Sequence, residues 1–399
     1  TGASNTAVGK FALRYNTTAS NNTAVGVSAL TTNTTGYSNT AVGTNAGDAI
    51  TTAAQNTLVG FDSGTTLTTG GDNIAVGDRS LKLATTGGNN VALGVVALEN
   101  TTTGGTNVAV GWGSLRANTT ASNNTAVGHS SLGANTTGAN NAAIGYQALV
   151  SNTTGASNVA TGRLTLAANT TASNNTAVGD SALTTNSTGE GNTAVGQGSL
   201  DANTTAANNT ALGSRSLTSN TTGAHNTGLG RDALYSNTVG AYNIAVGEGA
   251  LYNNVDGSRS VAIGRLALYT QDPASAVDMY NVAVGYDAGG KITTGIRNTI
   301  IGSRTGDALT DADYNVALGV DALTADTKGN KTVAIGVDAL AAQNFTSSTD
   351  TFNVAVGFQA GAAVTTGVQN TLIGGLAGDA TTTGESNTAV GYSALGANT

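Results

Sequence analysis

Carboxylate pairs are the residues of this chain that could do acid–base or metal chemistry. Asp321 and Asp338 lie 17 residues apart, and the whole chain repeats with this period. The repeat predicts that residues 17 apart lie in adjacent layers of β-structure, about 4.8 Å from each other. Two carboxylates at that distance can bind Ca²⁺ or form the acid and nucleophile of a glycosidase. Asp287 and Arg304 continue the same series, so we interpret all four residues as a solvated column of charges.

Histidine and cysteine offer no alternative site. His129 and His225 occupy different positions of the 17-residue series, which predicts exposed turn residues and no shared metal ion. The chain has no cysteine, so disulfides, thiolate catalysis and cysteine-based metal sites are excluded. We therefore predict no catalytic residue, no cofactor and no metal site, and we do not expect an enzyme.

Tyrosines and asparagines could instead contact or carry sugars. Tyr235, Tyr252 and Tyr269 are spaced by 17, which predicts an aromatic ladder that stabilises itself or, as a candidate glycan contact, stacks on sugar rings. Asn-Thr-Thr sequences are acceptors for glycosylation in a glycosylating cell, whereas elsewhere they are turn residues, and we favour turn ladders. These candidate glycosylation sites are Asn16, Asn33, Asn118, Asn135, Asn152, Asn169, Asn203 and Asn220.

All these spacings come from one repeat. The glycine that closes Asn-Thr-Ala-Val-Gly recurs every 17 residues and defines 23 units, with two steps of 21 that mark four-residue insertions. We call this glycine the anchor and number the other positions of a unit relative to it. The first anchors are Gly9, Gly26, Gly43, Gly60, Gly77 and Gly94.

Several positions of the unit hardly vary. Position −4 is Asn in 21 units, with Ser260 and Thr332 as the exceptions, and position +4 is Leu in 17 units and Gly in six. A unit of 17 residues is too short for two helices, which need about 34. It fits one coil of an all-β parallel β-solenoid, or β-roll, with two short strands and two turns. Twenty-three coils at about 4.8 Å predict a rod of about 110 Å.

The six units with glycine at +4 test this packing. They form three consecutive pairs, and in the second unit of each pair the usually small residue at −2 is large. In the pair that contains Gly47 and Gly64, this large residue is Leu58. Constant core volume would explain this exchange, so we infer that positions +4 and −2 share a packing compartment. Five of the six units also have an apolar residue at +7, such as Ile50, where we expect a different turn path.

Composition sets the class of protein. Leu, Ile, Val and Phe make up only 19% of the 399 residues, yet the net charge is −8 and there is one proline, which is unlike a disordered chain. A pI near 4.6 argues against nucleic-acid binding, and no apolar run is long enough to span a membrane. The first residues show no signal peptide.

We expect one continuous repeat domain over residues 1–399. Residues 231–360 stand out within it because they contain both insertions and most of the tyrosines and acidic residues. Loops on a rigid scaffold commonly carry recognition, so a binding surface is expected in this section. Coils this thin would expose an apolar face of Val and Ile, which predicts burial against identical chains, most simply in a homotrimer.

The unit resembles two families. Ser260–Gly264 (Ser-Val-Ala-Ile-Gly) and Asn107–Gly111 (Asn-Val-Ala-Val-Gly) resemble the signature of the YadA-like heads of trimeric autotransporter adhesins. The fuller unit resembles the repeats of bacteriophage and virus tail-fibre proteins. The resemblance covers the whole chain and implies a trimeric β-roll outside a cell or on a virion, with an adhesive or structural role.

The two ends of the sequence are in phase with the repeat. Eight residues follow Gly391 and nine end at Gly9, so that joining the ends writes one ordinary unit of 17. This phase fits end-to-end stacking into a filament, one period of a longer tandem array, or a fragment cut in phase. We expect an extracellular structural or adhesive fibre whose partners are other copies and cell-surface glycans or receptors; an ice-binding solenoid and a polysaccharide-binding tail fibre are the alternatives.

Overall fold

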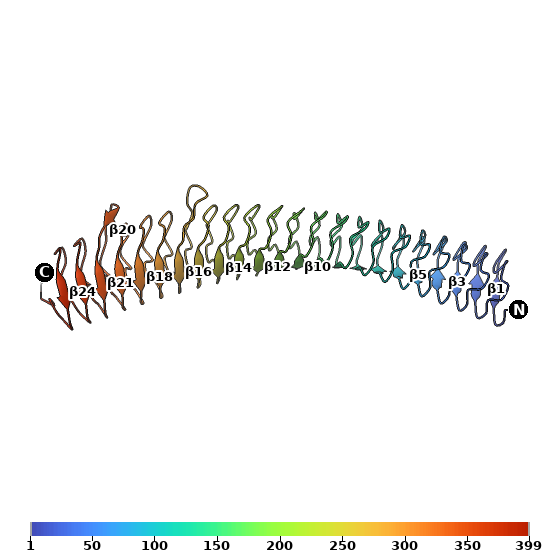
Figure 1. Ribbon diagram of the computed structural model, residues 1–399, viewed down its shortest axis with the longest axis horizontal. Helices are drawn as coiled ribbons and strands as arrows, with labels where there is room; N and C mark the ends of the chain where they lie inside the picture. The colour runs from blue at the N-terminus through green and yellow to red at the C-terminus, as the bar shows by residue number, and fades with distance from the viewer. Residues whose placement is uncertain (1, 398–399) are drawn as a thin grey trace. The chain divides into compact units, whose positions relative to one another are not determined.

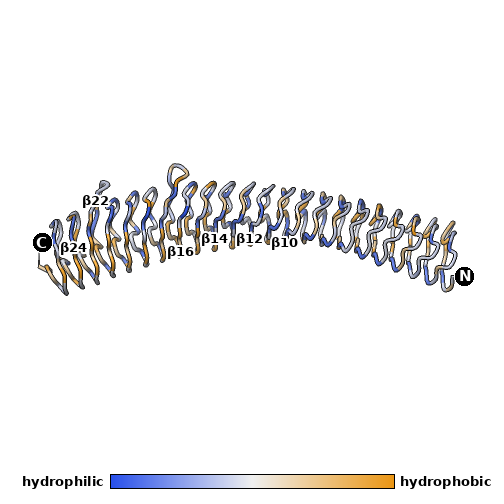
Figure 2. Tube along the Cα trace, viewed as in Figure 1, coloured by the Kyte–Doolittle hydropathy of each residue, from blue (hydrophilic) through white to orange (hydrophobic). Residues whose placement is uncertain are grey.

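The chain is an all-β parallel solenoid of 23 coils with a 17-residue period, as predicted (Figure 1). The computed structural model describes residues 2–397, and no helix occurs among them. Contacts divide the chain into two compact units, residues 1–192 and 193–399. Within each unit every coil contributes one strand to a parallel sheet, and apolar and polar residues recur at the same places from coil to coil (Figure 2).

The first unit contains eleven strands of three residues each. Their pairing is parallel and in register, so that Thr6 lies beside Thr23, Ala7 beside Ala24 and Val8 beside Val25. The strands are β1 (Thr6–Val8), β2 (Thr23–Val25), β3 (Thr40–Val42), β4 (Thr57–Val59), β5 (Ile74–Val76), β6 (Val91–Leu93), β7 (Val108–Val110), β8 (Thr125–Val127), β9 (Ala142–Ile144), β10 (Val159–Thr161) and β11 (Thr176–Val178).

The second unit continues the same pattern with twelve such strands. Two further two-residue strands, β20 (Gly329–Asn330) and β22 (Thr349–Asp350), pair with each other at the second insertion. The repeat strands are β12 (Thr193–Val195), β13 (Thr210–Leu212), β14 (Thr227–Leu229), β15 (Ile244–Val246), β16 (Val261–Ile263), β17 (Val282–Val284), β18 (Thr299–Ile301), β19 (Val316–Leu318), β21 (Val333–Ile335), β23 (Val354–Val356), β24 (Thr371–Ile373) and β25 (Thr388–Val390).

The expectation of two strands in every coil is wrong. An ordinary coil has one strand, at −3 to −1, and turns elsewhere, because positions −5, +2 and +4 hold the left-handed backbone conformation. In the coil around Gly26 these are Asn21, Ser28 and Leu30, with φ of 62°, 58° and 50°. Each costs a non-glycine residue about 1–2 kcal/mol, so packing and hydrogen bonds between coils must offset the strain.

Hydrogen bonds between coils run around the whole coil. At +2 the Ser28 N–H donates to the Lys10 carbonyl of the preceding coil (2.9 Å), and at +4 the Leu30 N–H donates to the Ala46 carbonyl of the following coil (3.0 Å). The turns therefore pair as regularly as the strands do, and the N–H groups at +2 and +4 point to opposite neighbouring coils.

The anchor must be glycine for two reasons. Its φ lies near +130° to +140°, as for Gly43 at 140°, a region that other residues rarely adopt. A Cβ on Gly43 would also overlap the carbonyl oxygen of Gly60, the next anchor. The anchors thus form a column in which adjacent backbones approach too closely for any side chain.

An ordinary coil has six interior positions, two of which are asparagine. In the coil around Gly26 the buried positions −2, +3 and +4 hold Ala24, Ala29 and Leu30, while −4 and +7 hold Asn22 and Asn33, all with no exposed surface. The sixth position, −7, is a small residue whose carbonyl serves the asparagines. Two polar groups in six explain how the chain folds with little apolar bulk, provided that both amides are hydrogen-bonded.

Both asparagine side chains satisfy that condition as donors, whereas the side-chain oxygen of Asn33 has no partner, because Ile50 occupies the +7 position of the next coil. The Asn22 and Asn33 side chains each donate to the carbonyl of Gly36 in the next coil, both at 2.9 Å. The Asn22 side-chain oxygen accepts the backbone N–H of Asn39, one coil on, also at 2.9 Å. Each coil thus uses the amides of one layer to position the backbone of the next.

Two of the three glycine pairs pack as the sequence predicts, whereas in the third Ile300 lies beside Gly306 and the space beside Gly289 is taken by Ile292 and Leu268. A Cβ on Gly47 or Gly64 would lie 2.8 Å or 2.9 Å from a methyl carbon of Leu58, so this one side chain occupies the space beside both glycines. Leu372 lies in the same way between Gly361 and Gly378. Positions +4 and −2 therefore do share one compartment.

The expected change of turn path in these units is wrong. Gly47 has φ of 61°, close to the 50° of Leu30 at the same position. The N–H of Ile50 donates to Gly47 (3.1 Å) as that of Asn33 does to Leu30 (3.3 Å). Ile50 is buried where asparagine normally is, because its side chain fills the interior without needing a different backbone.

A double-mutant cycle tests the shared compartment. Leu58→Ala should lower the free energy of unfolding by about 3 kcal/mol, because it leaves a cavity. Gly64→Leu alone should also destabilise the protein, since its side chain would overlap Leu58. The double variant restores alanine at −2 and leucine at +4, as in an ordinary coil, and should be more stable than Leu58→Ala alone in denaturant titrations. Simple addition of the two losses would contradict a shared compartment.

Candidate functional site

The outer side of the strands is an apolar surface repeated in every coil. Positions −3 and −1 point outward while −2 points inward, so that Ala41 is fully buried and Val42 is 37% exposed. Position −1 is Val, Ile or Leu in 22 coils, and position −3 is Thr in twelve, Val or Ile in ten and Ala in one. We call the rows at −3 and −1 the outward face. Ile144 (46% exposed) and Leu212 (49%) show its character in the two units.

The predicted tyrosine ladder forms. Tyr235 and Tyr252 stack with ring centroids 4.9 Å apart, and Tyr252 and Tyr269 stack at 5.1 Å. Burial, with smaller contributions from Tyr235 and Asp232, raises the pKa of Tyr252. Both faces of Tyr252 are therefore covered by tyrosines, and the guanidinium of Arg215 lies 5.5 Å from the centre of the Tyr235 ring. A sugar could reach the central ring only at its edge.

Other ring columns were not predicted. Trp112, His129 and Tyr146 stack at 4.7 Å and 5.4 Å, and His225 stacks on Tyr242 at 4.9 Å. The two histidines are exposed turn residues, as expected, and among residues 2–397 no three His, Cys, Asp or Glu side chains cluster as a metal site. The signal was present in the sequence, because each stack occupies one position of successive coils, +1 or −5.

Position −5 of the second unit alternates aromatic and cationic residues. Arg or Lys side chains lie 5.0–6.0 Å from the neighbouring ring centres, distances typical of cation–π contacts. This alternation avoids stacking like charges directly above one another. The column consists of Tyr242, Arg259, Tyr280, Arg297, Tyr314, Lys331 and Phe352.

The aspartate series is a column of charges, as interpreted from the sequence. Arg304 donates to Asp321 at 2.7 Å, which raises the pKa of Arg304, and the Gln359 amide donates to Asp338 at 3.4 Å. Burial, together with the nearby Asp307 carboxylate, raises the pKa of Asp287. Asp321 and Asp338 each have a partner other than the other carboxylate.

The Asn-Thr-Thr asparagines lie at +7 and point into the interior. Seven of the eight candidate glycosylation sites, all except Asn16, are fully buried. Asn152, for example, donates to Asn135 (2.8 Å) and to the Gly155 carbonyl (2.9 Å). A sugar on such a nitrogen would replace a hydrogen and fill space occupied by the coil, so glycosylation at these seven sites is incompatible with this packing.

The two insertions interrupt the asparagine columns at a defined atom. In an ordinary coil, such as the one around Gly247, Asn243 and Asn254 both donate to the Gly257 carbonyl at 2.8 Å. In the next coil, around Gly264, the residue at the place of Gly257 is Ala274, three residues after Gln271. Ala274 belongs to the first insertion and is exposed. Asparagines at −4 and +7 of that coil would therefore lose their common acceptor.

Both positions change in that coil. Position −4 is Ser260 and position +7 is Gln271, and the longer amide donates to Ser260 (3.0 Å) and to Asn254 (3.0 Å). Its oxygen accepts the side-chain amide of Asn281 in the following coil (2.9 Å). Gln271 thus connects the two columns that share a carbonyl elsewhere.

The second insertion repeats this solution. Thr332 is at −4 and Gln343 at +7, with the glutamine donating to Thr332 (3.1 Å) and accepting from Asn353 (2.9 Å). The only two units without asparagine at −4 are therefore those that precede the insertions. The sequence shows that Ser260 and Thr332 occur in the units before the insertions. The physical reason, a carbonyl group displaced by each insertion, is visible only in the structure.

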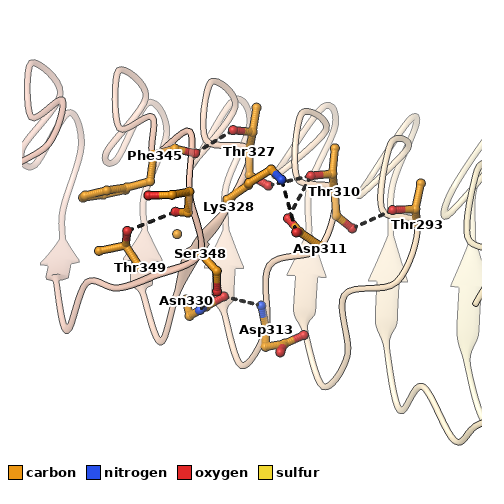
Figure 3. A network of polar contacts seen from close by, with 12 residues as sticks. Thr293, Thr310, Asp311, Asp313, Thr327, Lys328, Asn330, Phe345, Ser348 and Thr349 are labelled. Carbon is orange, nitrogen blue, oxygen red and sulfur yellow. Dashed lines mark hydrogen bonds and ion pairs between the residues drawn. The ribbon is translucent and has the colours of Figure 1, made fainter.

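The second insertion is held by a polar network (Figure 3). Thr327 donates to the Phe345 carbonyl (2.7 Å), and Asn330 donates to Ser348 (3.0 Å), which ties the inserted turn to the preceding coil. The fully buried Asp326, at +7, accepts the Phe345 N–H (3.0 Å) and the Gln343 amide (2.6 Å). A carboxylate suits this position because it only accepts hydrogen bonds and all its neighbours donate.

Two surface hollows lie beside left-handed glycines at +2. One, in the first unit, is lined by Trp112, Gly113, Arg116, Ser130, Gly133, Ala134 and Val150 and has a volume of about 250 Å³. The other, in the second unit, is lined by Arg231, Asp232, Glu248, Gly249, Tyr252, Leu266 and Tyr269, with about 180 Å³. Two of the three predicted glycan contacts, Tyr252 and Tyr269, thus line a hollow.

Comparisons with known protein families and curated proteins indicate no function for this chain. No model of a known protein family matches the chain. A search of curated proteins finds no match either. Within residues 2–397 no helix is long and apolar enough to cross a membrane.

The bridging glutamine gives a direct test. Gln271→Asn shortens the side chain by one methylene, so its amide should lose Asn281 and leave buried polar groups without partners. We expect a loss of about 1–3 kcal/mol in the free energy of unfolding. Gln197→Asn, at an exposed position, is the matched control and should change stability by less than about 0.5 kcal/mol. Equal denaturation midpoints for the two variants would contradict the bridging role.

Proposed function

We propose that this protein is a structural fibre protein whose chains associate with one another through the outward face, most simply as a homotrimer. The observation that carries the proposal is the exposure of aliphatic side chains at −1 in coil after coil of both units. Contiguous exposed apolar surface on a soluble protein commonly marks an interaction site. The resemblance of the repeats to adhesin heads and tail fibres favours a place outside a cell or on a virion.

The dimensions of the outward face suit such an interface. Three strand residues span about 10 Å and eleven coils about 53 Å, so the first unit alone offers roughly 500 Å² of flat area. A stable interface buries about 800 Å² on each partner, and projecting side chains present more surface than the flat area. The outward face of one unit is therefore of the size that a lasting contact requires.

The spacing of the outward face favours a second copy as the partner. Its side chains recur at the coil spacing of about 4.8 Å, so another chain of the same repeat can interdigitate at every coil. A surface without that repeat would fit only locally. End-to-end stacking of such assemblies into a filament is part of the same proposal.

Matched lysine variants test the interface. Val42→Lys, Val59→Lys and Val76→Lys combined place charges on the outward face of three successive coils. The control combines Thr35→Lys, Thr52→Lys and Thr69→Lys, which adds the same charge to exposed turns of the same coils. We expect the wild type and the control to sediment as oligomers and the valine variant as a monomer. A monomeric wild type, or a valine variant that still assembles, would overturn the proposal, and electron micrographs showing only discrete particles would exclude the filament.

Ice binding is the second candidate, because one observation favours it. Threonines at −3 stand beside valines at −1 on one regular face, as at Thr23 and Val25. The adjacent threonines of the Asn-Thr-Thr turns do not contribute, since they hydrogen-bond between coils, as Thr34 does to the Thr51 carbonyl (3.0 Å). An ice-binding protein should show thermal hysteresis that Thr23→Lys with Thr40→Lys abolishes and Thr35→Lys with Thr52→Lys preserves. No hysteresis in the wild type would remove this candidate.

A further inference from the structure

The hollow at Gly249 exists because a side chain is missing. Position +2 carries a side chain in 20 coils and glycine in three, at Gly113, Gly198 and Gly249. The backbone does not require glycine there, because Asp232 and Leu266 at +2 of the adjacent coils both have φ of 60°, near the 64° of Gly249. A Cβ on Gly249 would lie 3.1 Å from Leu266 and 3.6 Å from Tyr269, so a larger side chain would enter the hollow.

Both carboxylates that line this hollow are ion-paired. The guanidinium of Arg231 is hydrogen-bonded to Glu248, and Arg265 lies 3.6 Å from the same carboxylate. Arg215 pairs with Asp232 at 2.9 Å. Each carboxylate that lines the hollow therefore has a cation beside it, and a cationic ligand would have to compete with these arginines. A neutral ligand rich in hydroxyl groups could donate to the carboxylates and accept from Arg231.

The remaining lining is aromatic. Tyr252 and Tyr269 line the hollow together with Leu266, and both tyrosines are half-buried. Apolar C–H groups of a ligand would lie against these residues while its hydroxyls meet the ion pairs. The volume of about 180 Å³ is below the range of about 300–1,000 Å³ that drug-sized ligands occupy. It suits one six-membered sugar ring.

We propose that the hollow at Gly249 binds a single pyranose ring of a neutral glycan. The ion pairs of Arg231 with Glu248 and of Arg215 with Asp232 supply the hydrogen-bonding groups, and Tyr252 and Tyr269 supply the apolar contact. The hollow at Trp112 has no carboxylate in its lining, so it lacks the charged acceptors that the hollow at Gly249 offers to sugar hydroxyls. This proposal is independent of lateral assembly, because none of the residues that line the hollow at Gly249 is a strand residue of the outward face.

A pair of glycine variants tests the site. Saturation-transfer NMR of the full chain with the methyl glycosides of glucose, galactose, mannose and N-acetylglucosamine should detect binding of at least one of them. Gly249→Leu should abolish that signal by filling the hollow. Gly198→Leu is the matched control, because it places the same side chain at the same position, where the nearest atom to a Cβ is 3.9 Å away on Arg215. It should bind as the wild type does.

A second variant keeps the test decisive if Gly249→Leu fails to fold. Glu248→Gln preserves shape and should weaken binding about tenfold, the effect of losing a hydrogen bond to a charged group. Glu190→Gln, at an exposed position outside the hollow, should leave binding unchanged. The proposal is overturned if none of the four glycosides binds the wild type, if binding survives in Gly249→Leu, or if each control loses binding as its partner variant does.

Discussion

The structure depends on hydrogen bonds between coils that are identical in register. Because each residue lies beside its counterpart one coil away, a polar side chain that can both donate and accept satisfies itself along the stack. Asparagine does this twice in each ordinary coil, and the small residue at −7 contributes the carbonyl that both amides share. This arrangement replaces much of the apolar core that a globular domain of this length would need.

The same register explains what the sequence could predict. Coil number, period and the exchange between Gly64 and Leu58 follow from the spacing of residues, since stacking converts sequence distance into spatial contact. The left-handed leucines did not follow, because steric rules disfavour positive φ for a residue such as Leu30 and only hydrogen bonds on both sides of the turn stabilise it. That is also why a second strand was expected in each coil.

The candidate sites show a similar division. The ladder of Tyr235, Tyr252 and Tyr269 was predictable because one residue type recurs at one position. The column of Trp112, His129 and Tyr146 was missed because its members differ in type while sharing a position. The hollow at Gly249 was not predictable at all, since it depends on how far the neighbouring Leu266 and Tyr269 side chains reach. Strand positions are thus uniform and suit repetitive contacts, whereas +1, +2 and +5 vary and can create individual sites.

The bridging glutamine of each insertion and its partner at −4 lie within the coil that precedes the loop. Ser260 and Gln271 are eleven residues apart, as are Thr332 and Gln343, so one stretch of chain carries both the bridging amide and the loop that requires it. Recombination between repeats could therefore transfer a loop to a new place together with its bridging glutamine. The glycine exchange differs, because Gly47, Leu58 and Gly64 span two coils and would have to be inherited as a pair. The pairwise occurrence of all six glycine coils is the pattern that such inheritance would leave.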